Sequence, residues 1–163
     1  MKNLMTMTIA AVAFVMSMSS CSSSSSNDEP QPLVTQVIGS LTGNEIFMVD
    51  NEESSNETKT YGFTKATEVS VDMMIPEVGM GMMTIPSITV KGIALTQEGN
   101  TIKGKIAKYE GTVKGADGSD KSYTITDLAA LFSDNTVVVT YSMKYGKMPF
   151  PFEARFTGIR NRM

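Results

Sequence analysis

The sequence contains no histidine and no tryptophan, and its single cysteine is Cys21. Without histidine, the Ser-His-Asp and Cys-His catalytic arrangements are excluded, and so are zinc, iron or copper(II) sites that use histidine ligands. Proton transfer would fall to Asp, Glu, Lys or Tyr side chains. We therefore expect a protein that is not an enzyme and that uses no cofactor.

Positive charge is also scarce. The chain has 14 Lys and Arg residues against 17 Asp and Glu residues, which gives a formal net charge of −3. The only arginines, Arg155, Arg160 and Arg162, lie close together near the C-terminus. Binding of nucleic acid depends on clustered cationic side chains that neutralise phosphates, so nucleic acid is not expected as a partner.

The apolar run at residues 9–16 follows a short positive start at Lys2. This run is well below the roughly 20 residues that a membrane-spanning helix needs. A positive start, a short apolar segment and small residues before a cleavage site are typical of a secretory signal. We therefore interpret residues 1–20 as a signal peptide.

The segment Met18-Ser19-Ser20-Cys21 resembles a bacterial lipobox, which directs lipidation of its cysteine. The alternative is an ordinary signal with an incidental cysteine, but an unpaired thiol in an oxidising compartment would then lack a role. Residues 21–32 are rich in Ser, Pro and acidic side chains, and we expect a flexible tether there. The predicted location is the bacterial cell envelope, anchored to a membrane, and expected to be the outer one, through a lipid on Cys21. Whether the domain faces the periplasm or the cell surface stays open.

Residues 33–163 are predicted to form one all-β domain. Alternating apolar residues at 137–145 and 150–156, joined by a Gly/Pro connection, predict an antiparallel hairpin. Further strands are expected at 34–41, 44–50 and 60–74, with an acidic loop at 50–58. Residues 127–132 either finish a strand or form one helical turn. The apolar phase changes at Gly92, as in a sheet that bends. About eight strands are expected, in a small antiparallel barrel or, alternatively, a two-sheet sandwich.

Two segments, at residues 82–93 and 143–158, resemble calycin-like β-barrel lipoproteins of Bacteroidetes. The resemblance covers nearly the whole chain after the signal. It implies an eight-stranded lipocalin-like barrel behind a polar tether, with an interior that holds a small apolar ligand. It brings no catalytic residues with it.

The stretch DMMIPEVGMGMMTIP at residues 72–86 contains five methionines. Thioethers suit copper(I), but no histidine is present to complete such a site, so no metal is expected. The stretch could instead line a ligand cavity or fill a hydrophobic hairpin tip, with residues 76–79 as the connection. Similarly, Asp117-Gly118-Ser119-Asp120 lacks the acid spacing of a calcium loop and is expected to be a polar turn.

The favoured function is binding of a small hydrophobic molecule by a membrane-anchored barrel. The alternative is an interaction module that docks a partner protein or an uptake complex of the envelope. The candidate ligand-binding residues are Met73, Met74, Met80, Met82, Met83, Tyr141, Tyr145, Phe150 and Phe152.

Overall fold

The computed structural model describes residues 31–80 and 83–160. A short 3₁₀-helix, η1 (Leu33–Gln36), comes first among the described residues. It is followed by β1 (Gly39–Val49), β2 (Glu52–Thr67), β3 (Ser70–Ile75), β4 (Val78–Met80), β5 (Met83–Ile85), β6 (Ile88–Glu98), β7 (Thr101–Lys114), β8 (Asp120–Ser133), β9 (Thr136–Tyr145) and β10 (Phe152–Ile159).

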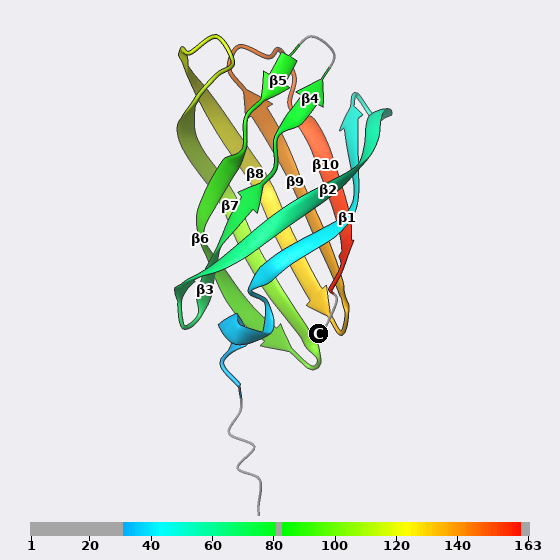
Figure 1. Cartoon of the computed structure of the whole chain (residues 1–163), viewed down its shortest axis with the longest axis vertical. Coiled ribbons are helices and arrows are strands. Elements are labelled where there is room, and N and C mark those ends of the chain that lie inside the picture. The colour runs from blue at the N-terminus through cyan, green and yellow to red at the C-terminus, as the bar shows by residue number, and fades with distance from the viewer. Residues whose placement is uncertain (1–30, 81–82, 161–163) are drawn as a thin grey trace, which may run out of the picture.

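Eight of these strands close into one antiparallel barrel, in the order β1-β10-β9-β8-β7-β6-β3-β2 (Figure 1). Strand β1 closes the ring, because it pairs with β2 through Leu41 and Tyr61 and with β10 through Phe47 and Ala154. The small strands β4 and β5 pair with each other as a hairpin inserted between β3 and β6. The prediction of an eight-stranded antiparallel barrel is confirmed, and the two-sheet sandwich is wrong.

Side chains alternate between the barrel interior and solvent along each strand, as the sequence pattern predicts. In β9, Val137, Val139, Tyr141, Met143 and Tyr145 are all buried, with more exposed residues between them. Strand β10 likewise alternates, with Phe152, Ala154 and Phe156 buried. These inward rows form one continuous hydrophobic core.

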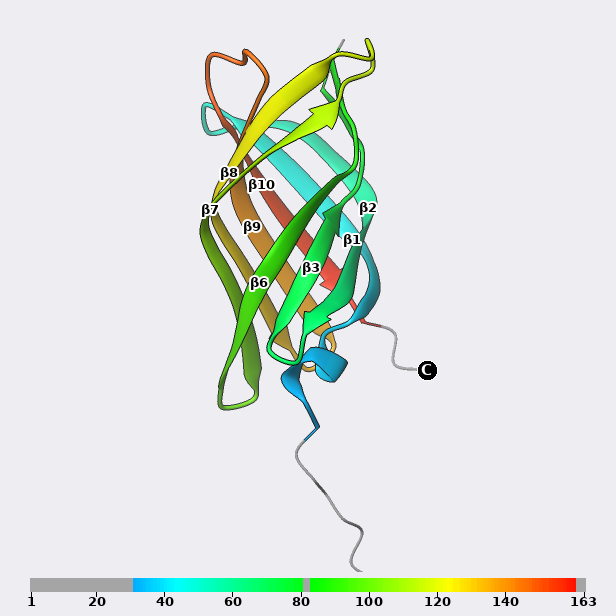
Figure 2. The same cartoon turned by 90° about the vertical axis from the view of Figure 1, so that its left-hand side faces the viewer.

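The two ends of the barrel are built differently (Figure 2). We call one the tether end, because the described chain begins there; it holds η1 and the turns near residues 68, 99 and 134. The other, the far end, holds the β4–β5 hairpin and the connections 50–51, 115–119 and 146–151. At the tether end, Val34 and Val37 around η1 are fully buried. The Arg160 guanidinium donates a hydrogen bond to the Gln36 carbonyl oxygen and so ties η1 to the end of the last strand.

The strand register shifts at four places in the barrel, and two of these shifts coincide with a positive φ value. Gly92 adopts φ +71 where the β3–β6 register shifts, and its N–H donates to Asp72 Oδ1 at 2.9 Å. This confirms the predicted bend at Gly92. Asp127 adopts φ 55 where the β8–β9 register shifts between Thr126 and Ala129. Residues 127–132 therefore finish strand β8 and do not form a helical turn.

The N-terminal part of the domain differs from the prediction. Residues 33–36 form η1, so the strand expected at 34–41 is wrong; the first strand begins at Gly39. The acidic loop expected at 50–58 is also wrong. Asp50 and Asn51 both take positive φ values, which suits a two-residue hairpin turn, and β2 begins directly at Glu52. The single strand expected at 60–74 is divided into β2 and β3 by the turn at residues 68–69.

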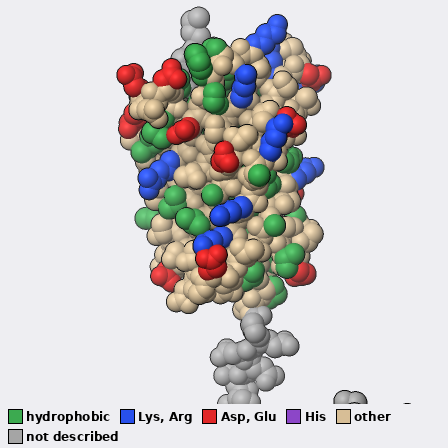
Figure 3. Space-filling view, turned by 180° about the vertical axis from the view of Figure 1, so that it is seen from behind, with side chains coloured by type: hydrophobic (Ala, Val, Ile, Leu, Met, Phe, Trp, Pro, Cys, Tyr) green, Lys and Arg blue, Asp and Glu red, His purple; other side chains and the backbone are tan. Residues whose placement is uncertain are grey.

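Charged side chains of both signs are interspersed over the face seen in Figure 3. Ion pairs among the described residues include Lys108 with Glu110 at 2.9 Å and Lys114 with Asp120 at 2.8 Å. On that face no large area carries a single sign of charge.

Candidate functional site

Four of the predicted ligand-binding residues face the barrel interior. Met73 lies on β3, Tyr141 and Tyr145 on β9, and Phe152 on β10, and each is at most 4 % exposed. Tyr145 is the one that also lines a surface pocket. Sequence periodicity therefore identifies inward-facing side chains well but does not show which of them a ligand could reach.

Two other predicted residues point outward. Met74 follows Met73 on the same strand, and neighbouring strand residues face opposite sides, so its side chain is 41 % exposed. Phe150 is 58 % exposed because β10 begins only at Phe152. Pro149 and Pro151 cannot donate ladder hydrogen bonds, which explains why the strand does not extend back to Phe150. Neither Met74 nor Phe150 joins the interior.

The methionine-rich stretch forms the β4–β5 hairpin. Met80 and Met83 are its last paired residues, and Met82 lies outside the described residues. Val78 and Ile85, the first pair, are each 2 % exposed and belong to the core. The connection is shorter than the predicted 76–79, since Val78 and Gly79 already lie within β4.

A buried carboxyl group lies inside the barrel, and the sequence reasoning missed it. Glu45 on β1 is fully buried. The Tyr61 hydroxyl donates a hydrogen bond to Glu45 Oε1, and Tyr61 Oη lies 3.0 Å from Tyr141 Oη. Because the single hydroxyl proton of Tyr61 is used on Glu45, Tyr141 is the donor to Tyr61. Glu45 Oε2 has no hydrogen-bond partner among the described residues.

Burial controls the ionisation of this cluster. Removal from water raises the pKa of Glu45, although the hydrogen bond from Tyr61 and the charge of Lys59 oppose the rise. Burial also raises the pKa of Tyr61 and of Tyr141 well above the ordinary tyrosine value, and the neighbouring carboxyl adds to both shifts. The arrangement favours a neutral carboxyl group surrounded by neutral phenols. The inward position of Glu45 could have been predicted from the sequence, because Glu45 shares the period-2 phase of Leu41 and Phe47.

A pocket of about 680 Å³ opens at the far end of the barrel. Its wall combines Thr84 of β5, the start of β8, and the connections that follow β7 and β9. The residues with the greatest chemical interest are Asp117, Lys121, Tyr145, Lys147 and Met148. This volume lies within the range that is usual for small-molecule sites.

The charges in the far-end pocket are mostly paired. Lys121 Nζ lies 2.8 Å from Asp117 Oδ2, and this hydrogen bond, together with those from Ser119, holds the pKa of Asp117 well below its usual range. Asp120 pairs with Lys114. Lys147, by contrast, makes no ion pair with any described residue. The Tyr145 hydroxyl is buried and has no hydrogen-bond partner in the described parts of the chain, and burial raises its pKa.

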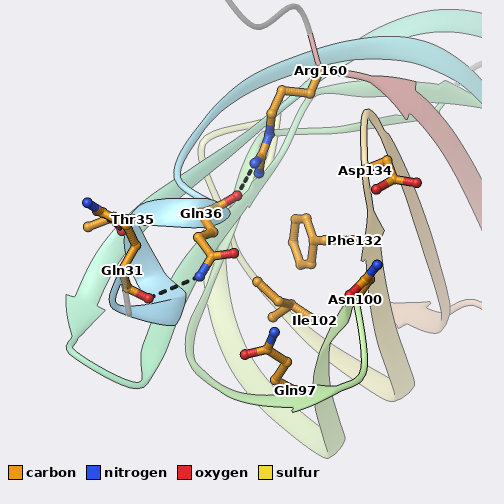
Figure 4. Close-up of a pocket in the computed structure, with 9 residues that line it drawn as sticks. All are labelled: Gln31, Thr35, Gln36, Gln97, Asn100, Ile102, Phe132, Asp134 and Arg160. Carbon is orange, nitrogen blue, oxygen red and sulfur yellow. Dashed lines mark hydrogen bonds between the residues drawn. The ribbon is translucent and has the colours of Figure 1, made fainter. Parts of the chain in front are cut away.

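A second pocket, of about 590 Å³, lies at the tether end (Figure 4). Ile102 of β7 and Phe132 of β8 are its apolar residues, and Arg160 lies on one side. Its other lining residues are polar: Gln31, Thr35, Gln36, Gln97, Asn100 and Asp134. None of these was predicted from the sequence, because they come from η1 and the segment before it, from the end of β6 and from turns, far apart in the chain.

The described ranges, 31–80 and 83–160, contain no group of three or more Cys, Asp or Glu side chains placed to hold a metal ion. None of the helical segments there has the length and apolarity required to cross a membrane. Cys21, the predicted lipidation site, lies outside the described residues, as do the predicted signal peptide and most of the tether.

Comparison with solved structures supports the barrel fold. The chain is similar to a crystal structure from Bacteroides fragilis described as "a putative outer membrane protein", with a TM-score of 0.60 and 19% sequence identity. The match covers 80% of this chain and 53% of the other, so this chain spans about half of that protein's length. No family model matches the sequence, and no curated protein matches it either. The shared feature is therefore the fold.

Proposed function

We propose that this chain is a lipid-anchored β-barrel protein of the bacterial envelope that binds a small amphipathic molecule with an acidic group. The location rests on the signal-like residues 1–20 and on the lipobox-like segment ending at Cys21. The similar structure from Bacteroides fragilis, which carries an outer-membrane description, agrees with that location. The binding site of the proposal is the far-end pocket.

One observation carries the ligand proposal: the far-end pocket is lined both by a buried hydroxyl without a hydrogen-bond partner and by a cation without an ion pair among the described residues. The hydroxyl is that of Tyr145, and the cation is Lys147. Buried polar groups without a partner are costly, so a ligand that hydrogen-bonds to Tyr145 would remove part of that cost. A carboxylate at Lys147 would be favoured by its charge.

Side chains fill the interior of the barrel, so a wholly apolar ligand, as expected from the sequence, would have little room there. We therefore propose an amphipathic ligand. Aromatic rings occupy the barrel: Tyr61 stacks on Phe156 with centroids 4.2 Å apart, and Phe47 contacts Phe152 edge-to-face at 5.2 Å. An apolar tail would instead lie against Tyr145 and Met148 at the mouth. The ligand would enter the far end only partly.

Native mass spectrometry of the protein purified from its own host tests for a bound small molecule. Calorimetric titration then uses decanoate as an acidic amphiphile and decanol as its uncharged match. We expect decanoate to bind more tightly. Lys147→Ala should weaken decanoate binding about tenfold, as the loss of a charge-assisted contact implies. Lys144→Ala is the matched control, because Lys144 is a nearby lysine that lies on β9, is exposed and does not line the pocket. No co-purified molecule, together with equal weak binding of both probes, would reject the proposal.

Docking of a partner protein is the second candidate, and exposed Phe150 favours it. Large aromatic side chains are enriched at the centres of protein interfaces. Phe150 lies between two prolines at the far end and lines a shallow hollow with Met48 and Asn51. A partner captured from envelope extracts by the wild-type chain, but not by Phe150→Ala, would favour docking over ligand binding.

The anchor is tested separately by Cys21→Ala. If Cys21 carries lipid, this substitution should move the protein from the membrane fraction to the soluble fraction, because the acyl chains that anchor it would be absent. Retention of the variant in the membrane fraction would contradict the lipid anchor without affecting the ligand proposal.

A further inference from the structure

The tether-end pocket has a chemistry different from that of the far-end pocket. We infer that it is a second binding site, for a neutral polyhydroxylated molecule such as a saccharide. This inference does not depend on the far-end site, since the two pockets share no residue.

Side-chain amides dominate the polar wall of this pocket. Gln36 is the last residue of η1 and Gln31 lies two residues before η1, whereas Gln97 lies near the end of β6 and Asn100 lies in the β6–β7 turn. Each amide offers both hydrogen-bond donors and an acceptor. A hydroxyl group also donates and accepts, so neighbouring hydroxyls of a sugar match such a wall better than an acceptor-only ligand does.

The charge of the pocket argues against a phosphate or a metal ion. Arg160 and Asp134 carry one charge each, of opposite sign. Tight phosphate sites use clustered cations or backbone N–H groups, and hard cations require several oxygen ligands, commonly carboxylates. A neutral ligand suits a pocket whose formal charge is zero.

The apolar floor suits the C–H face of a sugar ring. Phe132 is 6 % exposed and Ile102 is 5 % exposed, so each presents a small area at the base of the pocket. Figure 4 shows the Phe132 ring and the Ile102 side chain between Gln36 on one side and Asn100 on the other. Small-molecule sites usually combine apolar side chains at the base of the pocket with polar groups at its rim.

Several contacts hold the rim in place without using all of its hydrogen-bonding capacity. Gln36 Nε2 donates to the Gln31 carbonyl oxygen at 3.0 Å, and Gln97 Nε2 donates to the Gly99 carbonyl oxygen at 3.0 Å. These bonds leave the amide oxygens of Gln36 and Gln97 for a ligand. Arg160 donates to the Gln36 backbone and fixes η1 against the barrel. Such preorganisation lowers the ordering cost of binding.

The test uses the full chain as purified from its host, kept in a detergent without a sugar headgroup if it is lipidated. Maltose, cellobiose and lactose are the probes, each added up to about 50 mM, which detects millimolar Kd values. Two-dimensional NMR follows the side-chain amide signals of Gln97 and Asn100. We expect at least one sugar to shift these signals in a saturable way.

Substitutions then locate the site. Gln97→Ala and Asn100→Ala should each weaken binding of that sugar about three- to tenfold, as expected for one or two lost hydrogen bonds. Both residues are exposed, so the variants should fold; circular dichroism checks this. Asn56→Ala removes an exposed amide on another part of the barrel and should leave binding unchanged.

Two results would overturn the inference. One is the absence of any saturable shift with all three sugars, and the other is binding that Gln97→Ala and Asn100→Ala leave intact. Lys147→Ala separates the two pockets: it should weaken decanoate binding and leave sugar binding unchanged. Failure of decanoate to bind would therefore reject only the far-end proposal.

Discussion

The two halves of the barrel interior differ in chemistry although they belong to one closed sheet. The half near the tether end is filled by apolar side chains, among them Val34, Val37, Phe63 and Phe132. The half near the far end carries the carboxyl group of Glu45 and the hydroxyl groups of Tyr61, Tyr123, Tyr141 and Tyr145. Apolar packing stabilises a fold without further requirement, whereas buried polar groups stabilise it only when they are paired. The tether half therefore supplies stability, and the far half holds groups whose state a ligand or pH can change.

The largest expected effect is in the tether half. Phe63 is 2 % exposed and its ring meets that of Phe132 edge-to-face, with centroids 5.0 Å apart. Phe63→Ala removes this contact and leaves a cavity, which should cost about 3–5 kcal/mol in the free energy of unfolding. Urea denaturation followed by far-UV circular dichroism measures it. Phe150→Ala, at an exposed phenylalanine, should change stability by less than about 0.5 kcal/mol. Similar losses of stability in Phe63→Ala and Phe150→Ala would contradict the larger stabilising role given to the tether half.

A smaller effect is expected in the far half from single hydroxyl groups. Tyr61→Phe removes the donor to Glu45 Oε1 and should cost about 1–3 kcal/mol, because it leaves a buried acceptor without a partner. Tyr145→Phe is the matched substitution, since the Tyr145 hydroxyl has no described partner to lose. It should be neutral or slightly stabilising. Urea denaturation at pH 7 compares the two variants, and a Tyr145→Phe loss as large as that of Tyr61→Phe would show that the hydroxyls are equivalent.

The strand pattern could be predicted from the sequence where polar and apolar residues alternate strictly. Strands β9 and β10 and the bend at Gly92 follow from that alternation and from glycine. The turn at Asp50 and Asn51 was missed because a run of acidic residues resembles a solvated loop. The bulge at Asp127 was not predicted, because no glycine marks its position in the sequence.

The candidate sites could be predicted only in part, for a physical reason. Tyr145 was found because its phase on β9 places it inside the barrel. Glu45 has the same kind of phase on β1, but a carboxyl group is normally evidence for an outward face. Gln97, Asn100 and Gln36 meet only because barrel closure brings η1 to the β6–β7 turn, and no local pattern records that contact.

The last prediction concerns the pH dependence that Glu45 gives to the far half. Burial raises the pKa of Glu45 above its ordinary value of 4.5, so the folded state holds this proton more tightly than the unfolded state does. At pH values well below 4.5 the carboxyl group is protonated in both states, so its ionisation has no effect on the free energy of unfolding. As pH rises above 4.5 toward the higher folded-state pKa, the unfolded state ionises first and is thereby favoured. The contribution of Glu45 to stability must therefore fall with rising pH.

Glu45→Gln should remove this part of the pH dependence, because glutamine stays neutral while keeping the size and the acceptor oxygen for Tyr61. We expect the variant to lose less stability than the wild type between acidic pH and about pH 8, because burying the charged carboxylate of the wild type is unfavourable. Urea denaturation at a series of pH values gives both curves, and their difference isolates Glu45 from the exposed carboxylates. Glu153→Gln is the control, because Glu153 is exposed on β10 and its substitution should leave the slope unchanged. Parallel wild-type and Glu45→Gln curves would mean that Glu45 titrates as it does in water, and the far half would then lack the pH sensitivity that separates it from the tether half.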